Sequence, residues 1–136
     1  MVRLLVPSDF PFMWELAQRR LPDRVFDSEA AQEWFLQQVL IRQDLYLPIR
    51  TSDAFLIAML SLVPWNLSSR ECLVLFLVTD EHAIWQGLSL LRGSIKWAKM
   101  SGAAHWHIWH DHSDAGILAR RVGAKLNTPR YRLDLT

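Results

Sequence analysis

The stretch CLVLFLVTDEHAIWQGLSLLRGSIKWAKMSG, residues 72–102, carries the signals that decide the fold. Residues 72–78 are all apolar, which is typical of a strand covered on both faces of its sheet. A polar turn follows, and from Ile84 to Met100 apolar residues recur at helical spacing, with a stripe of Leu88, Leu91, Ile95 and Ala98. Gly102 stands just beyond, where a helix C-cap glycine belongs. The stretch predicts a strand, a turn and a helix over 84–100.

Shorter elements of the same kinds surround this stretch. The patterns predict a strand at Val2–Val6, a helix over Pro11–Arg19 capped by Ser8 or Asp9, and a second helix that begins at Asp27 or Ser28. Further strands are expected at residues 45–50, 54–63, 72–79, 105–109 and 124–135, the last as a hairpin or bent pair, and a last helix from 113 or 114 to 122. The fold class is therefore α/β (α+β). The order βααβββαβαβ(β) places about six to seven strands in one mixed sheet with helices on both faces.

Composition limits the classes of function. The 136 residues suffice for one domain, 1–136, and 51% hydrophobic with 21% charged residues is a globular balance. The net charge of +1 and the short, balanced pairs Arg19–Arg20 and Arg120–Arg121 predict no nucleic-acid partner. The apolar stretches fall short of the ~20 residues that span a bilayer, so no membrane role is expected. Cys72, the single cysteine, has no partner for an internal disulfide, which fits a cytoplasmic location.

The element order and the segment HAIWQG, residues 82–87, resemble the GNAT superfamily of acyl-CoA-dependent N-acyltransferases. The resemblance covers nearly the whole chain and is strongest over 72–135. In that family a turn Q/R-x-x-G-x-G/A links a strand to a helix, and its backbone N–H groups hold the pyrophosphate of coenzyme A. Counting back from Gly102 places His82, Trp85 and Gly87 at the three defined positions. The resemblance implies that these residues, with Val78 at the strand end, border acetyl-CoA.

A second family pattern, N-x-x-A-x-x-x-Y, follows the next strand. Counting back from Gly123 places His112 at the Asn, Ala115 at the Ala and Ala119 at the Tyr. The resemblance therefore implies that His112 and Ala115 also border the cofactor, while the tyrosine that serves many active members as general acid is absent. Trp85 likewise replaces the glycine that lets backbone approach phosphate closely. The spacing of the two family motifs is retained, but the tyrosine and the middle glycine are missing. This combination predicts an eroded acetyl-CoA site.

The general base is the other group that transfer to an amine needs. The strands at 45–49 and 54–63 contain no Glu or His, so the sequence points to Asp80 or Glu81 as the base, next to the expected cleft. Either carboxylate can equally be a solvated turn residue.

Within the superfamily the chain also resembles degenerate GNAT-like virion proteins of short-tailed bacteriophages. The shared features are Val78-Thr79-Asp80 before the turn, Trp106 with Trp109 in a Trp-rich strand, and Gly123-Ala124 in place of Gly-Phe. This resemblance implies a structural or interaction component, in the host cytoplasm or the virion. Contacts with a protein partner or a second copy are then expected through exposed tryptophans, Trp65 and Trp85 above all.

Two alternatives stay open. The first is a working N-acetyltransferase that moves an acetyl group from acetyl-CoA to an amine without the tyrosine. The second follows from HWHIWHDH, residues 105–112: His105 and His107 face one side of a strand, and His110 and His112 follow, so the four could bind zinc or nickel. The motif lacks a complete ligand spacing, so the leading expectation is no metal, and no cofactor unless the chain is an active acetyltransferase.

Overall fold

The computed structural model describes residues 1–21, 27–61, 70–109, 113–127 and 130–135. Within them the chain forms a seven-stranded sheet of order β1-β2-β3-β4-β5-β7-β6. The elements are β1 (Arg3–Leu4), η1 (Pro7–Asp9), α1 (Phe10–Arg20), α2 (Ser28–Trp34), η2 (Phe35–Val39), β2 (Tyr46–Arg50), β3 (Ala54–Ser61), β4 (Glu71–Thr79), α3 (Ile84–Met100), β5 (His105–Trp109), α4 (Ser113–Arg121), β6 (Lys125–Asn127) and β7 (Arg130–Asp134).

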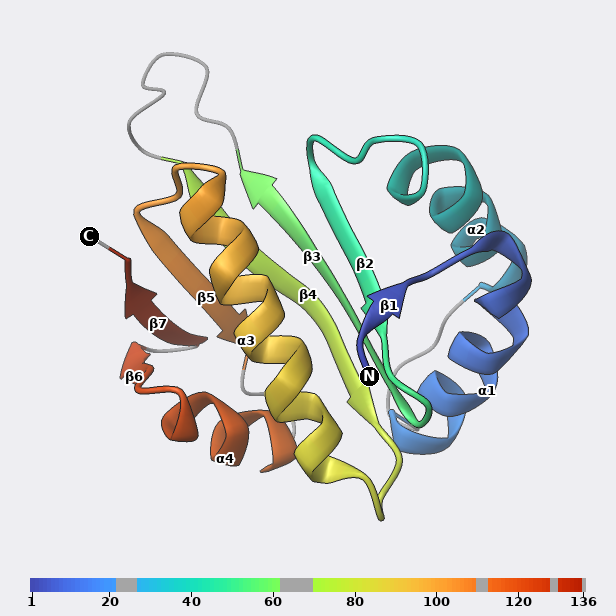
Figure 1. The fold of residues 1–136 in the computed structure, drawn as a ribbon. Coiled ribbons are helices and arrows are strands. Elements are labelled where there is room, and N and C mark those ends of the chain that lie inside the picture. Colours follow the sequence, from blue (N-terminus) through green and yellow to red (C-terminus); the bar gives the residue numbers. More distant parts are fainter. Residues whose placement is uncertain (22–26, 62–69, 110–112, 128–129, 136) are drawn as a thin grey trace.

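Helices cover both faces of this sheet, as Figure 1 shows: α1 and α2 lie on one face, and α3 and α4 lie on the other. Neighbouring strands pair antiparallel except β4 and β5, which run parallel because α3 connects them. The expected mixed α/β architecture is confirmed. Among the described residues, no helix has the length and apolar character needed to cross a membrane.

Local signals place the helix ends well. The Asp27 carboxylate caps α2 by accepting hydrogen bonds from the N–H groups of Glu29 and Ala30. α3 has the predicted bounds, and Gly102 beyond it has a φ of +79°, a left-handed conformation that favours glycine. Asp9 precedes α1 but does not cap it with its side chain, because its carboxylate binds Arg3, Arg50 and the Val6 N–H instead.

The buried face of α3 differs from the predicted stripe. Leu91 and Ala98 are buried as expected, but Leu88 and Ile95 are only partly buried, and Leu90 and Ser94 are fully buried in addition. Burial of Ser94 is possible because its hydroxyl donates to the Leu91 carbonyl at 2.7 Å and accepts from Trp106 Nε1 at 2.9 Å. The stripe prediction was wrong at this point because apolar spacing alone does not identify a satisfied polar core residue.

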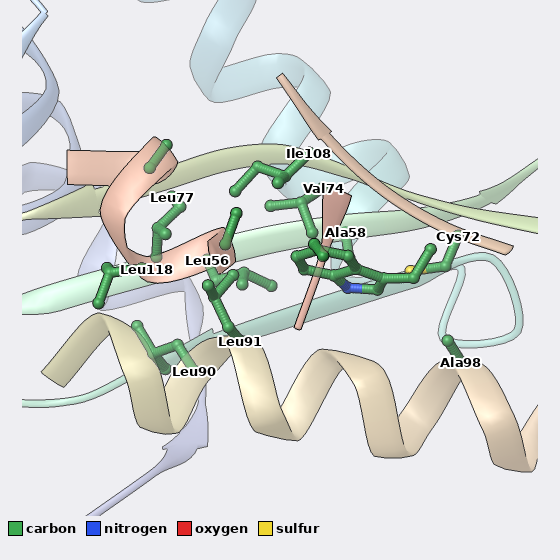
Figure 2. Packing of buried hydrophobic residues seen from close by; sticks show 14 of the residues in the cluster. Leu56, Ala58, Cys72, Val74, Leu77, Leu90, Leu91, Ala98, Ile108 and Leu118 are labelled. Carbon is green, nitrogen blue, oxygen red and sulfur yellow. The ribbon is translucent and has the colours of Figure 1, made fainter. Parts of the chain in front are cut away.

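A β-bulge at Leu75 decides which side chains of β4 face which helices. Ile57 pairs with Phe76 and Ala58 pairs with Val74, so Leu75 has no partner of its own on β3. Before the bulge, Cys72 and Val74 face α3. After it, Leu77 faces α3, as Figure 2 shows, while Phe76 and Val78 pack on the α1 side.

Candidate functional site

The pairing of β4 with β5 stops at this bulge. The two strands pair only from Glu71 with His105 to Val74 with Ile108. β4 then continues to Thr79 while β5 ends at Trp109, so the described part of β5 pairs with no residue of β4 beyond Val74. Bulges are over-represented next to active sites because they redirect backbone and side chains. The end of β4 therefore has a backbone edge that β5 does not use.

The N-terminus of α3 follows directly from this unpaired end of β4. The helix has 17 residues, and Ala83 at its N-cap position makes no side-chain capping bond. The first N–H groups of any helix lack acceptors within the helix, and the helix dipole adds positive potential there. The N–H groups of Ile84 and Trp85 thus stand at an uncapped, electropositive end, which is the chemistry that phosphate binding needs.

Trp85 does not fill this helix end. The residue is 59% exposed, so its ring lies on the surface rather than inside the turn. The side chain of His82 is 90% exposed and lies 3.6 Å from the Glu81 carboxylate. The tryptophan at the position of the family's middle glycine is therefore not buried in the turn before α3.

Other residues assigned to the cofactor contribute to packing. A Cβ added to Gly87 would lie 2.6 Å from Leu118 Cδ1 and 3.0 Å from Thr79 Cγ2, so Gly87 faces the core between α3, α4 and β4. Ala115 is fully buried in the same core, as is Ala119 at the position of the family's tyrosine. Val78 is buried on the opposite face, against α1.

The two candidate bases have different surroundings. Asp80 Oδ2 accepts a hydrogen bond from Arg19 of α1 at 3.2 Å, and its N–H donates to the Asp53 carbonyl at 2.8 Å. Its side chain is 27% exposed. Glu81 is well exposed, and its carboxylate lies 3.6 Å from His82 Nε2. Asp80 is therefore the more firmly positioned carboxylate.

The sequence did not identify Gln86 as a functional or structural residue. Its side chain hydrogen-bonds the start of α3 to the turn between β2 and β3. Gln86 Oε1 accepts hydrogen bonds from the Thr51 hydroxyl and from the Asp53 N–H, the latter at 2.9 Å. Its Nε2 donates to Asp53 Oδ2 at 3.2 Å. Nothing in the spacing of α3 distinguishes this glutamine from a solvated one, because its partners are more than 30 residues away in the sequence.

The histidines of β5 are divided between two environments. His105 Nδ1 lies 2.7 Å from Asp134 Oδ1, and buried His107 lies 3.5 Å from the Glu71 carboxylate. His110 and His112, like Trp65, lie outside the described residues. Among the residues that the structure does describe, no three His, Cys, Asp or Glu side chains gather closely enough to hold a metal ion.

Comparison with known proteins gives a likeness in structure alone. No protein-family model matches the chain, and no curated protein matches it by sequence. Among solved structures, an acetyltransferase of the GNAT family from Streptococcus pneumoniae is 14% identical, with a TM-score of 0.71 over 100% of this chain and 99% of that one. A ribosomal-protein-alanine N-acetyltransferase from Brucella melitensis is 12% identical, with a TM-score of 0.71 over 99% of each chain.

A third similar structure, from Salmonella typhimurium, was solved with its cofactor acetyl-CoA. It is 12% identical, with a TM-score of 0.69 over 100% of this chain and 94% of that one. Identities this low establish the fold, and they leave the activity to be argued from the site. The chain has the fold of the GNAT acetyltransferases.

Proposed function

We propose that the protein binds acetyl-CoA at the N-terminus of α3, beside the part of β4 that β5 does not pair with, and that its catalysis of acetyl transfer to an amine is weak. One observation carries the binding proposal: the N-terminus of α3, which has no side-chain cap, follows the part of β4 that β5 does not pair with, and the Trp85 side chain there is exposed. The N–H groups of Ile84 and Trp85 would hold the pyrophosphate. His82 is close enough in sequence to add a donor.

Bound there, acetyl-CoA would supply an acetyl group activated as a thioester. Asp80, oriented by Arg19, is the residue we assign to removing a proton from the amine, with Glu81 as the alternative. No tyrosine acts from position 119, because that residue is Ala119, which is fully buried. General acid–base groups contribute typically 10²–10⁴-fold to a rate, so the missing acid predicts turnover that is lower by about that factor.

Titration calorimetry with acetyl-CoA tests the binding proposal. We expect saturable binding to the native chain and a large loss in Ala83→Asp. The new carboxylate would cap the first-turn N–H groups and repel phosphate, so affinity should fall about tenfold while stability rises by up to about 1 kcal/mol. Ser89→Asp is the matched control, because it adds the same charge at an exposed position further along α3. Absence of binding by the native chain, or equal losses in the two variants, contradicts the proposal.

Release of free thiol from acetyl-CoA, measured with a panel of amines, tests the transfer step. We expect slow turnover that Asp80→Asn reduces further and Glu81→Gln leaves unchanged. The reverse pattern would transfer the role of base to Glu81. Rapid turnover would contradict the inference that the acid is missing.

A second proposal is an interaction role without catalysis, as a structural component of a bacteriophage particle located in the host cytoplasm or virion. The observation that favours it is the exposure of Trp85, a large aromatic side chain of the kind enriched in protein interfaces. Light scattering of the native chain and of Trp85→Ala measures any self-association through this residue. Mass spectrometry of purified particles tests the virion assignment, and absence of the chain from them contradicts it.

A further inference from the structure

A groove of about 680 Å³ lies between the C-terminal half of α3, the end of α4 and the end of β7. Four of the described residues that line it are positively charged, and all four are exposed: Arg92, Lys96, Lys99 and Arg121. Asp134 is the one acidic residue of the described lining. The whole chain has a net charge of only +1, so this basic groove concentrates positive charge at one place on a nearly neutral protein.

The four cations of the basic groove are not neutralised by acidic side chains. Among the described residues, no ion pair includes any of the four. Asp134 Oδ1 lies 2.7 Å from His105 Nδ1 and 3.2 Å from Arg132 Nε, and neither of these two residues belongs to the described lining. The positive charges of the groove are therefore available to an anion from outside the chain.

The helix dipoles account for only half of this cluster. Cations are favoured in the last turn of a helix because they offset its partial negative charge, which explains Lys99 in α3 and Arg121 in α4. The effect falls off within one turn. Arg92 and Lys96 lie eight and four residues before the end of α3 at Met100, so the helix end does not explain them.

The spacing of these two cations fits an extended peptide with acidic side chains. Arg92 and Lys96 are four residues apart on α3, which is about 6 Å along the helix axis. In an extended peptide, side chains two residues apart point to the same side and are separated by about 6.5–7 Å. Acidic residues at alternate positions of such a peptide can therefore meet Arg92 and Lys96 in turn.

The rest of the described lining is aliphatic, which favours a peptide over a nucleic acid. It consists of four partly buried side chains that pack on the core and keep some surface exposed: Ile95, Val122, Leu133 and Leu135. Aliphatic side chains of a peptide gain free energy by covering such a surface. The bases of single-stranded nucleic acids stack on aromatic side chains, and the described lining contains none.

We infer that the basic groove binds an extended acidic segment of a partner protein, in which acidic residues alternate with aliphatic ones. The acidic side chains pair with the four cations, and the aliphatic side chains cover the apolar part of the lining. Lys96 is twelve residues from Ile84, or about 18 Å along α3. The groove is therefore separate from the proposed acetyl-CoA site, and binding there does not depend on the proposed function.

Calorimetry with a blocked hexapeptide in which glutamate alternates with leucine tests the inference. The same peptide with glutamine in place of glutamate is its neutral counterpart. We expect saturable binding of the acidic peptide, at least about tenfold weaker binding of the neutral one, and a loss of affinity for the acidic peptide as the salt concentration rises. Hexathymidylate should bind more weakly than the acidic peptide. Equal or tighter binding of hexathymidylate overturns the inference, since the groove would then select negative charge alone.

Substitutions in the groove locate the binding. Lys96→Gln should reduce the affinity for the acidic peptide about two- to fivefold, as expected for one exposed charge pair, and Arg92→Gln combined with Lys96→Gln should reduce it about tenfold. Glutamine has a helix propensity close to those of lysine and arginine, so α3 should be retained.

Lys125→Gln is the matched control, because it removes the same charge from an exposed lysine outside the described lining, and it should leave the affinity unchanged. Absence of binding of the acidic peptide to the native chain overturns the inference. Equal affinity for the acidic and neutral peptides, or equal effects of Lys96→Gln and Lys125→Gln, also overturns it.

Discussion

At the residue scale, Gly87 shows that a motif glycine can also be needed for packing. The family resemblance assigns it to the phosphate turn, whereas in the structure its missing side chain lets α3 lie against Leu118 and Thr79. Gly93, two turns later on the same helix, has only ordinary van der Waals space around it, with Ile49 Cδ1 at 3.4 Å. The two glycines therefore differ in what a methyl group would meet.

We predict opposite effects on stability for the same substitution at these two positions. Gly87→Ala should lower the free energy of unfolding by about 1 kcal/mol, because overpacking of about 1–3 kcal/mol exceeds the gain in helix propensity. Gly93→Ala should raise it by up to about 1 kcal/mol. Urea denaturation of both variants measures this. A stabilised Gly87→Ala would show that Leu118 adjusts at little cost.

Cys72 supplies a prediction about reactivity. The thiol is fully buried, and burial raises its pKa to about 12. Because the thiolate is the reactive form, the native protein should not react with an aromatic disulfide reagent at pH 8. One thiol per chain should react in denaturant. Fast reaction of the native protein would indicate that β4 opens readily.

At the element scale, α3 is joined to β5 by a polar contact inside the core. Trp106 on β5 donates to Ser94, which in turn donates to the Leu91 carbonyl of its own helix. Both residues have no exposed surface. The contact joins α3 to β5 and restricts rotation of the helix about its own axis.

Removal of this hydroxyl should be costly. Ser94→Ala leaves the Trp106 N–H buried without its acceptor, which predicts a loss of about 1–3 kcal/mol in the free energy of unfolding. Ser89→Ala is the matched control on the exposed face of α3 and should change stability little, or increase it slightly through helix propensity. Chemical denaturation compares the two. Equal stability of the variants would mean that another group satisfies Trp106.

At the scale of the whole molecule, a buried carboxylate ties the N-terminal segment to the sheet. Asp9 binds Arg3 on β1 at 2.8 Å and Arg50 on β2 at 2.9 Å, and it accepts from the Val6 N–H. The Arg50 guanidinium carbon also lies 3.6 Å from the centroid of the Phe12 ring, so α1 contacts the arginine that binds Asp9. The hydrogen bond from Arg3 in particular lowers the pKa of Asp9 from 3.8 to about 2.

This lowered pKa predicts a defined pH dependence of stability. Protonation is easier in the unfolded chain, so the contribution of Asp9 is complete above about pH 4 and is lost as the pH falls toward 2. The contribution is on the order of 1–2 kcal/mol. Asp9→Asn should have a lower free energy of unfolding than the native chain at pH 7, and that free energy should change less between pH 4 and 2. Asp44 is exposed, so the free energy of unfolding of Asp44→Asn should vary with pH as that of the native chain does. Urea unfolding at several pH values measures the difference, and parallel curves for native and Asp9→Asn would contradict it.

The sequence by itself determined the features that depend on neighbours in the chain. The bounds of α3, the cap at Asp27 and the glycine at 102 follow from helical periodicity and capping, which are local effects. Continuous apolar strands correctly predicted a sheet covered on both faces. The catalytic and cofactor assignments at Asp80 and His82 remain predictions, since the fold positions them but no structural observation tests their roles.

Only the tertiary structure decided the rest. CLVLFLV is apolar at every position, so its sequence does not say which alternate side chains face α3 and which face α1. The bulge at Leu75 selects the residues that face α3. Ser94, Gln86 and Asp9 became structural residues because their partners come from distant parts of the chain. The exposure of Trp85 and the pocket between α1 and α2 likewise depend on how the helices lie on the sheet, and packing between distant elements leaves no periodic signal in the sequence.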